Sequence, residues 1–112
     1  MSYSVQTTPS FERAAKRLAR KYPHLRDDLR VLIRRLADDP FFGTAIPGFQ
    51  HRVWKVRLGS VDMRAGKRGG FRVIYFVRRD AQIVYLVFVY PKSEKADMTS
   101  AEIESLLEEI DD

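Results

Sequence analysis

The chain has 112 residues, 45% of them hydrophobic, with 20 lysines and arginines against 15 acidic residues, and it contains no cysteine. This profile predicts one globular domain, residues 1–112, and excludes disulfides, cysteine nucleophiles, iron–sulfur clusters and cysteine-based zinc sites. Only His24 and His51 could supply imidazole to a metal, and the longest apolar run, residues 83–90, is too short to cross a membrane. We therefore expect a cytoplasmic protein without a metal, a cofactor or a membrane partner.

Charge is unevenly distributed along the chain. Residues 1–93 carry 19 basic and 7 acidic side chains, a net charge of +12, whereas residues 94–112 carry 1 and 8, a net charge of −7. A basic body attracts polyanions because neutralising their phosphates releases condensed counterions. Nucleic acid or the ribosome is thus the leading class of partner, and solvated helix faces are the alternative explanation.

The N-terminal part predicts a short strand followed by a basic helical hairpin. Residues 3–7 are β-prone, and Thr8 with the proline after it suits the start of a helix. Apolar residues then recur at helical spacing over residues 9–22 and again over residues 25–39, with lysines and arginines on the opposite faces. Pro23 separates the two helices.

The middle of the chain changes to the period of strands. Residues 41–52 hold two glycines and a proline and are predicted to form a loop. Strands are predicted over residues 53–58, 71–77 and 83–90, the last of them apolar on both faces and therefore central in the sheet. In the first strand, Trp54 and the aliphatic residues at alternate positions are expected to face the helices.

A C-terminal acidic helix is predicted over residues 99–111, because Thr99 and Glu102 have the spacing of a capping box. It either packs through its isoleucine and leucine stripe or screens the basic body with its carboxylates. The predicted order of elements is β-α-α-β-β-β-α. We predict an α+β fold in which a small, mostly antiparallel sheet of three or four strands carries the helical hairpin on one face.

Arg72 is the most informative candidate for chemistry. A charge in the middle of an apolar strand must face solvent, an anion or a carboxylate. If Lys55 and Arg57 of the neighbouring strand share its face, the three side chains form a cationic surface suited to a phosphate and a stacked base. The alternative is an ion pair between Arg72 and an acidic residue such as Glu94.

Two loops hold further candidates. Residues 66–70 (GKRGG) lack the glycine spacing and the serine or threonine of a P-loop, so they are either a basic finger that contacts RNA or a glycine hinge. His51 could be a general base, although a lone loop histidine is more often a surface residue. The sequence has no pattern typical of a triad hydrolase or a histidine-based metalloenzyme.

Several short motifs together resemble one known family. They are TPSF at 8–11, KYP at 21–23, VWKVR at 53–57, GKRGGFRVIY at 66–75 and VYPKSEK at 89–95. Over nearly its whole length the chain resembles RelE-type toxins of bacterial toxin–antitoxin modules, within the RelE/ParE superfamily. The resemblance implies a small sheet packed by a helical hairpin. It also implies an mRNA interferase, a ribosome-dependent endoribonuclease that inhibits translation and is held inactive by a cognate antitoxin.

The resemblance also implies which residues act. Lys55 and Arg57 match the family's basic residues on the first of the three main strands, and Arg72 matches its mid-strand arginine. Lys92 falls near the basic residue that follows the last strand. Several members use a tyrosine near the C-terminus, but no tyrosine follows Lys92 here, so Tyr90 is the candidate hydroxyl. The expected RNA-binding residues are Arg52, Lys67, Arg68 and Lys95.

The implied reaction is metal-free transesterification, in which an RNA 2′-hydroxyl attacks the adjacent phosphate. Arg72 and Lys92 are expected to stabilise the developing charge, and Lys55 to act as base if neighbouring cations favour its neutral form. A ParE-type inhibitor that binds DNA gyrase without catalysis is the alternative, because fold alone does not separate the two functions. A plain RNA-binding module is the third possibility.

Overall fold

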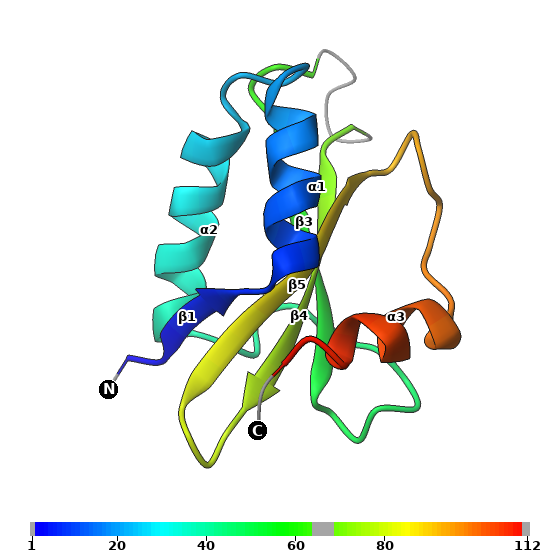
Figure 1. Ribbon diagram of the computed structural model, residues 1–112. Helices are drawn as coiled ribbons and strands as arrows, with labels where there is room; N and C mark the ends of the chain where they lie inside the picture. Colours follow the sequence, from blue (N-terminus) through cyan, green and yellow to red (C-terminus); the bar gives the residue numbers. More distant parts are fainter. Residues whose placement is uncertain (1, 64–68, 111–112) are drawn as a thin grey trace.

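The computed structural model describes residues 2–63 and 69–110, which form a five-stranded sheet and three helices (Figure 1). The strands and helices, in chain order, are β1 (Ser4–Thr7), α1 (Pro9–Ala19), α2 (Leu25–Asp38), β2 (Thr44–Ala45), β3 (Val53–Leu58), β4 (Phe71–Arg78), β5 (Ile83–Pro91) and α3 (Ser100–Leu107).

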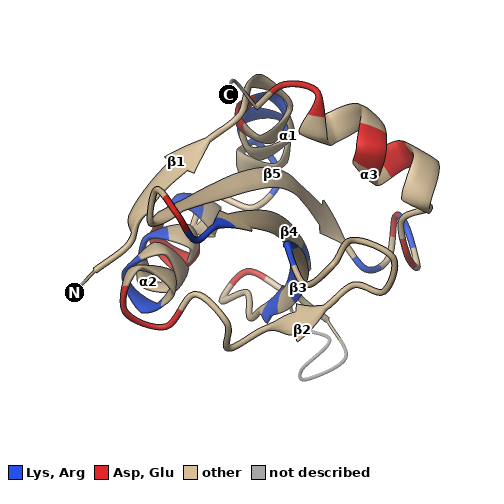
Figure 2. Cartoon of the chain, turned by 90° about the horizontal axis from the view of Figure 1, so that it is seen from below, with Lys and Arg blue, Asp and Glu red and all other residues tan. Residues whose placement is uncertain are grey.

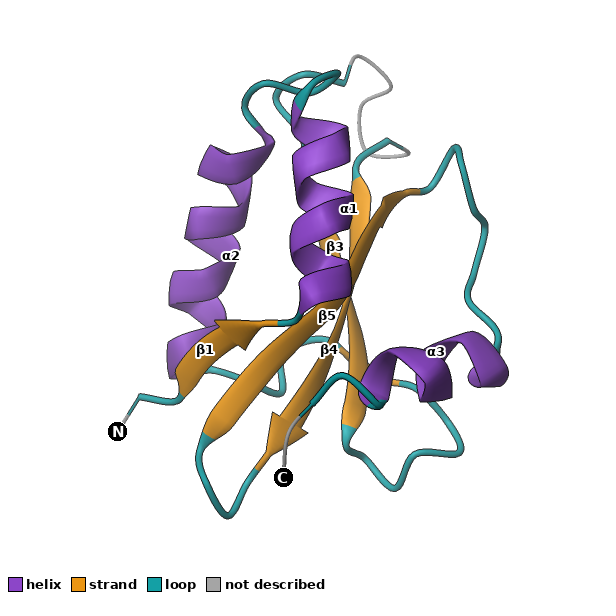
Figure 3. Cartoon of the chain, viewed as in Figure 1, coloured by secondary structure: helices purple, strands orange, loops and turns teal. Residues whose placement is uncertain are grey.

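The sheet has the order β1-β5-β4-β3-β2, with β1 parallel to β5 and every other neighbouring pair antiparallel. The α1–α2 hairpin covers one face, and α3 lies over the other (Figures 2 and 3). This arrangement confirms the predicted α+β class and the position of the hairpin. The third predicted strand, β5, is interior as expected, although β4 occupies the centre of the sheet.

The predicted sheet of three or four strands was one strand too small. The missed strand is β2, which lies inside the predicted loop 41–52. Thr44 pairs with Lys55 and extends the sheet beyond β3. The close approach depends on Gly43, because a Cβ there would lie 2.7 Å from the carbonyl oxygen of Lys55 and equally close to the hydroxyl of Tyr75. A two-residue strand formed by such tertiary contacts leaves no periodic signal in the sequence.

The C-terminal helix is shorter than the predicted span of 99–111. Its start is as expected, since Thr99 and Glu102 form a capping box. After Leu107 the backbone tightens into i→i+3 hydrogen bonds, and the carboxylate of Glu109 accepts a hydrogen bond from the backbone nitrogen of Ser10 at 2.8 Å. The helical conformation thus ends just before Glu109, the residue that connects this end of α3 to the start of α1.

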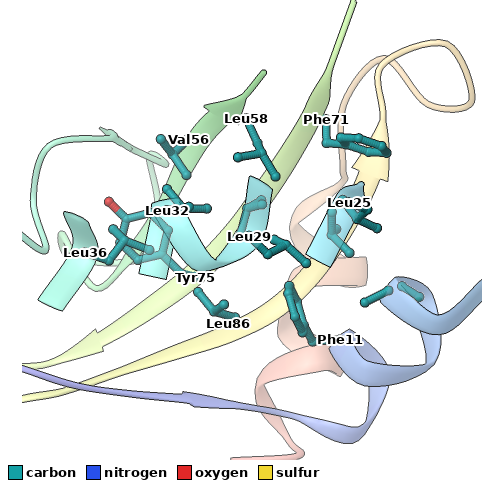
Figure 4. Packing of buried hydrophobic residues seen from close by; sticks show 14 of the residues in the cluster. Phe11, Leu25, Leu29, Leu32, Leu36, Val56, Leu58, Phe71, Tyr75 and Leu86 are labelled. Atoms are coloured by element: carbon teal, nitrogen blue, oxygen red, sulfur yellow. The ribbon is translucent and has the colours of Figure 1, made fainter. Parts of the chain in front are cut away.

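The main core lies between the hairpin and the sheet (Figure 4). Phe71, Val73, Tyr75 and Val77 of β4 all face the hairpin and are almost completely buried. Helix α1 begins as predicted, because the hydroxyl of Thr8 accepts a hydrogen bond from the backbone nitrogen of Phe11. The predicted helix-facing side chains of β3 also belong to this core; they are Trp54, Val56 and Leu58.

A smaller core lies between α3 and the opposite face of the sheet. Ile103 of α3 is buried with Ile74 of β4 and Val87 of β5. The stripe of apolar residues on α3 therefore serves packing, as one of the two sequence interpretations has it. None of the helices in the described ranges is long and apolar enough to span a membrane.

Gly70, at the entrance to β4, is expected to be irreplaceable. Its φ is +99°, and a Cβ would lie 2.6 Å from the carbonyl oxygen of Leu58. We expect Gly70→Ala to lower the free energy of unfolding by about 2 kcal/mol in urea titrations. Gly59→Ala is the matched control, since nothing lies within 4 Å of its Cβ position. Equal urea midpoints for the two variants would contradict this explanation.

Candidate functional site

Three predicted site residues form one row across the face of the sheet that carries α3. The Cα of Arg57 in β3 is the register partner of that of Arg72 in β4, and Arg72 is in turn the partner of Tyr90 in β5. Lys55 shares the face of Arg57, because side chains two positions apart on a strand point to the same side. The register therefore puts Lys55, Arg57 and Arg72 on the same face of the sheet, which sequence analysis could state only as a condition. Figure 2 shows the basic segments of β3 and β4 side by side.

The two arginines of the row are available to an anion. Arg57 is exposed and forms no ion pair with any described residue. Within the same part of the chain, the guanidinium of Arg72 makes only a long hydrogen bond, 3.4 Å, to the carbonyl oxygen of Phe71. The alternative pairing of Arg72 with Glu94 is not formed, since Glu94 binds Arg17 at 3.1 Å. Like charges directly opposite each other on a sheet are destabilising. A bound phosphate between the two guanidiniums would remove that repulsion.

Tyr90 ends the row with a hydroxyl that is buried and lacks a hydrogen-bond partner among the described residues. The residue as a whole is only 2% exposed. Burial raises the pKa of the hydroxyl, the nearby carboxylate of Asp97 raises it further, and Arg72 lowers it in part. The hydroxyl is therefore protonated at neutral pH and able to donate a hydrogen bond. An unsatisfied buried hydroxyl is costly, and such groups concentrate at functional sites.

Acidic residues at and before α3 neutralise part of the cationic face. The Nζ of Lys55 lies 3.5 Å from Oδ1 of Asp97. Lys95 binds the carboxylate of Glu102 at 2.6 Å, and this hydrogen bond, aided by the backbone of Thr99, lowers the pKa of Glu102 to about 2. Sequence analysis identified Glu102 only as a helix cap. The cap spacing gave no signal of its second partner, because the loop between Lys95 and Thr99 decides that contact.

Lys92 lies at the same end of the sheet as the row. Its backbone nitrogen donates a hydrogen bond to the carbonyl oxygen of Gly70, two residues before Arg72, and its side chain is exposed. Lys95 and Tyr90 also line an open groove of about 620 Å³ between α1 and α3, together with Phe88 and Met98. Along one edge, the candidate site therefore borders a hollow with aromatic and apolar walls.

The remaining predicted residues are not brought to the row. Arg52 precedes β3, so it lies at the opposite end of that strand from Arg57. Lys67 and Arg68 lie outside the residues that the structure describes. His51 is exposed, and its carbonyl oxygen accepts a hydrogen bond from Nε1 of Trp54 at 3.0 Å. This contact involves the backbone of His51 and not its imidazole. The described residues include no group of acidic or histidine side chains arranged to hold a metal.

No protein-family model matches the sequence, and a search of curated proteins found no match. Two solved structures resemble the fold. A chain of the toxin–antitoxin complex RelBE2 from Mycobacterium tuberculosis superposes with a TM-score of 0.60 and 18% identity over 80% of this chain and 91% of that chain. A mutant of the E. coli toxin RelE in the free state superposes with a TM-score of 0.56 and 19% identity, over 97% of this chain and 94% of that chain. The chain therefore has the fold of RelE toxins.

The repulsion between the two paired arginines generates a test of the site. We expect Arg57→Gln to raise the free energy of unfolding by about 0.5 kcal/mol at low salt, because it removes one of two like charges at a direct cross-strand position. The gain should shrink in high salt, which screens exposed charges. Urea titrations at both salt concentrations measure it, with the exposed Arg34→Gln in α2 as control. A loss of stability at low salt would contradict the repulsive pairing.

Proposed function

We propose that the chain is the toxin of a toxin–antitoxin module and acts as a ribosome-dependent endoribonuclease that cleaves mRNA. The observation that carries this proposal is the Arg57–Arg72–Tyr90 row on the α3-bearing face of a RelE fold. Two arginines at directly paired strand positions supply positive charge for a phosphodiester that gains negative charge during cleavage. In this proposal the guanidiniums of Arg57 and Arg72 stabilise that charge.

The proposed reaction is transesterification within the RNA strand. The 2′-oxygen bonds to the adjacent phosphorus and gives up its proton, the bond from phosphorus to the 5′-oxygen breaks, and that leaving oxygen takes a proton. Arg57 and Arg72 stabilise the phosphorane, and Lys92 is the candidate for neutralising the phosphate after the cut. Lys55 is the candidate base, and it has to leave its ion pair with Asp97 before it can accept the proton. The products are a 2′,3′-cyclic phosphate and a free 5′-hydroxyl.

Tyr90 has a narrower role than a general base. Because burial raises its pKa, it is a hydrogen-bond donor to the phosphate or the leaving oxygen. Its hydroxyl is buried, and the residue lines the same groove as Met98 and Glu102, so RNA has to enter that groove or displace its walls to reach the hydroxyl. Ribosome dependence fits this geometry, since a small open face cannot by itself hold the strand in an attack conformation.

An antitoxin is the expected protein partner. One neighbour in fold is described as a toxin–antitoxin complex, and the cationic face of this chain is complementary to an acidic or amphipathic segment. Neutralising the row would block the phosphate site directly. Formation of such a complex would explain how a cell tolerates a ribonuclease of this kind.

The decisive experiment maps mRNA 5′ ends across the genome shortly after the chain is induced in a bacterial host. We expect new cuts inside translated regions, and we expect Arg72→Ala to reduce them by a factor of about 10²–10³, typical of losing one group that stabilises a transition state. The exposed Arg34→Ala is the matched control and should cut normally. Growth arrest with intact mRNA would instead favour a ParE-type gyrase inhibitor.

A second prediction concerns the nucleophile. A reporter mRNA with a single 2′-deoxynucleotide on the 5′ side of the mapped cut should resist cleavage on programmed ribosomes, because the attacking oxygen is missing. The matched control places the deoxynucleotide several positions away, where cleavage should continue. Cutting at the modified position would overturn the transesterification mechanism while leaving the ribonuclease assignment intact.

A further inference from the structure

A second cationic pocket lies at the end of the sheet opposite the row, where β3 begins and β4 ends. Arg52, Arg78 and Arg79 line this open pocket of about 380 Å³ together with Phe76. Asp80 also lines it, and one of its carboxylate oxygens accepts a hydrogen bond from the backbone nitrogen of Ala81 within the turn. The excess of arginines leaves the pocket positively charged. Figure 2 looks onto this end of the molecule.

The backbone that presents Arg52 is held in an unusual conformation. Gln50 and His51 both have positive φ, 56° and 59°, which costs side-chain-bearing residues energy and is found where the surroundings fix the chain. Trp54 holds the carbonyl oxygen of His51, and the carbonyl oxygen of Arg52 accepts a hydrogen bond from the backbone nitrogen of Val77 at 2.8 Å. These contacts fix Arg52 beside the end of β4.

Arg79 is held by an aromatic ring. Its guanidinium lies 4.6 Å from the centre of the Phe41 ring, and the ring of Phe41 in turn packs on Trp54. A guanidinium stacked on a ring keeps its N–H edge free for a planar anion such as phosphate, and it loses less entropy when it binds. Arg52 and Arg79 are both exposed, so both can reach a ligand.

A second, partly apolar hollow continues from the cationic pocket. This second cavity, of about 210 Å³, shares Arg52 and Phe76 with the first and is also lined by Phe49 and Leu107. The two cavities thus offer one compartment rich in arginines and one in which aromatic and aliphatic side chains stand beside Gln50 and Arg52. A nucleotide has the same two parts, a phosphate and a flat base that stacks on aromatic rings.

We propose that this two-part pocket binds a nucleotide unit of RNA, with the phosphate on Arg52 and Arg79 and the base against Phe76 and Phe49. The site is separate from the row, because Arg78 and Arg72 are six residues apart on β4, or roughly 20 Å at the usual rise of a strand. It stands on its own geometry and does not require the chain to cleave RNA. If the proposed ribonuclease function holds, the pocket adds an RNA contact remote from the cut.

The test is an NMR titration of the full-length chain, without ribosomes, with uridine 5′-monophosphate and with a short single-stranded oligoribonucleotide. We expect both probes to shift the amide signals of residues 49–53 and 76–82. The double substitution Arg52→Ala/Arg79→Ala should weaken binding of the mononucleotide by about tenfold, the usual loss when charge-assisted hydrogen bonds are removed. It should also lower the slope of log affinity against log salt for the oligonucleotide by about 0.7 per lost phosphate contact.

The controls distinguish binding in the pocket from nonspecific attraction to a positively charged surface. Arg20→Ala/Arg34→Ala removes the same charge from exposed positions outside the pocket and should leave the binding of the mononucleotide unchanged. Equal losses in the two double variants, or shifts scattered over α1 and α2, would overturn the pocket. Ribose 5-phosphate binding as tightly as the nucleotide would overturn the assignment of a base to the apolar hollow.

The same titration on Arg72→Ala keeps the two proposals apart. That variant should bind the mononucleotide normally at the second pocket, whatever becomes of cleavage in cells. Loss of mononucleotide binding in Arg72→Ala would place the ligand at the row and overturn the second pocket. Shifts of residues 49–53 and 76–82 in the unsubstituted chain are read directly, so the test holds even if the double variant fails to fold.

Discussion

Burial of the helix-facing side chains of β4 is the constraint on which the site depends. Phe71, Val73, Tyr75 and Val77 are packed against the hairpin with almost no exposure. Because side chains alternate along a strand, a register slip of one residue would move these four to the opposite face and bring Arg72 into the core, where an unpaired charge is very costly. The core therefore fixes which face carries Arg72, and the β3–β4 register then places Arg57 beside it.

The opposite face of the sheet contains features that are unfavourable for stability. It holds two arginines as direct cross-strand partners and, in Tyr90, a buried hydroxyl without a partner among the described residues. Each feature lowers stability, and local conflicts of this kind are expected at functional sites, where a ligand resolves them. The acidic side chains of Asp97 and Glu102 relieve the conflict in part by pairing with Lys55 and Lys95. They leave the arginines of the row unpaired.

Sequence patterns predicted what local physics determines. The Thr8 and Thr99 caps, the two amphipathic helices and the alternation around Trp54 are all short-range signals, and the structure confirms them. The row depends on how β3, β4 and β5 pair with one another. This register is a long-range property, so the sequence could predict the row only as a condition. Strand β2 and the early end of α3 were missed because tertiary contacts of Gly43 and Glu109 create them. Arg52 was grouped with the other basic residues by composition, which carries no information on sheet ends.

Helix α3 separates the two cationic regions. Arg72 and Arg78 share one face of β4, and between them lie Ile74 and Phe76, which belong to the apolar cluster that α3 covers. A phosphate backbone cannot follow that face from one arginine to the other, because apolar side chains and the helix occupy the path. An RNA that used both regions would have to pass around α3 or fold back. Helix α3 thus keeps the two proposed anion sites apart at a fixed separation along the sheet.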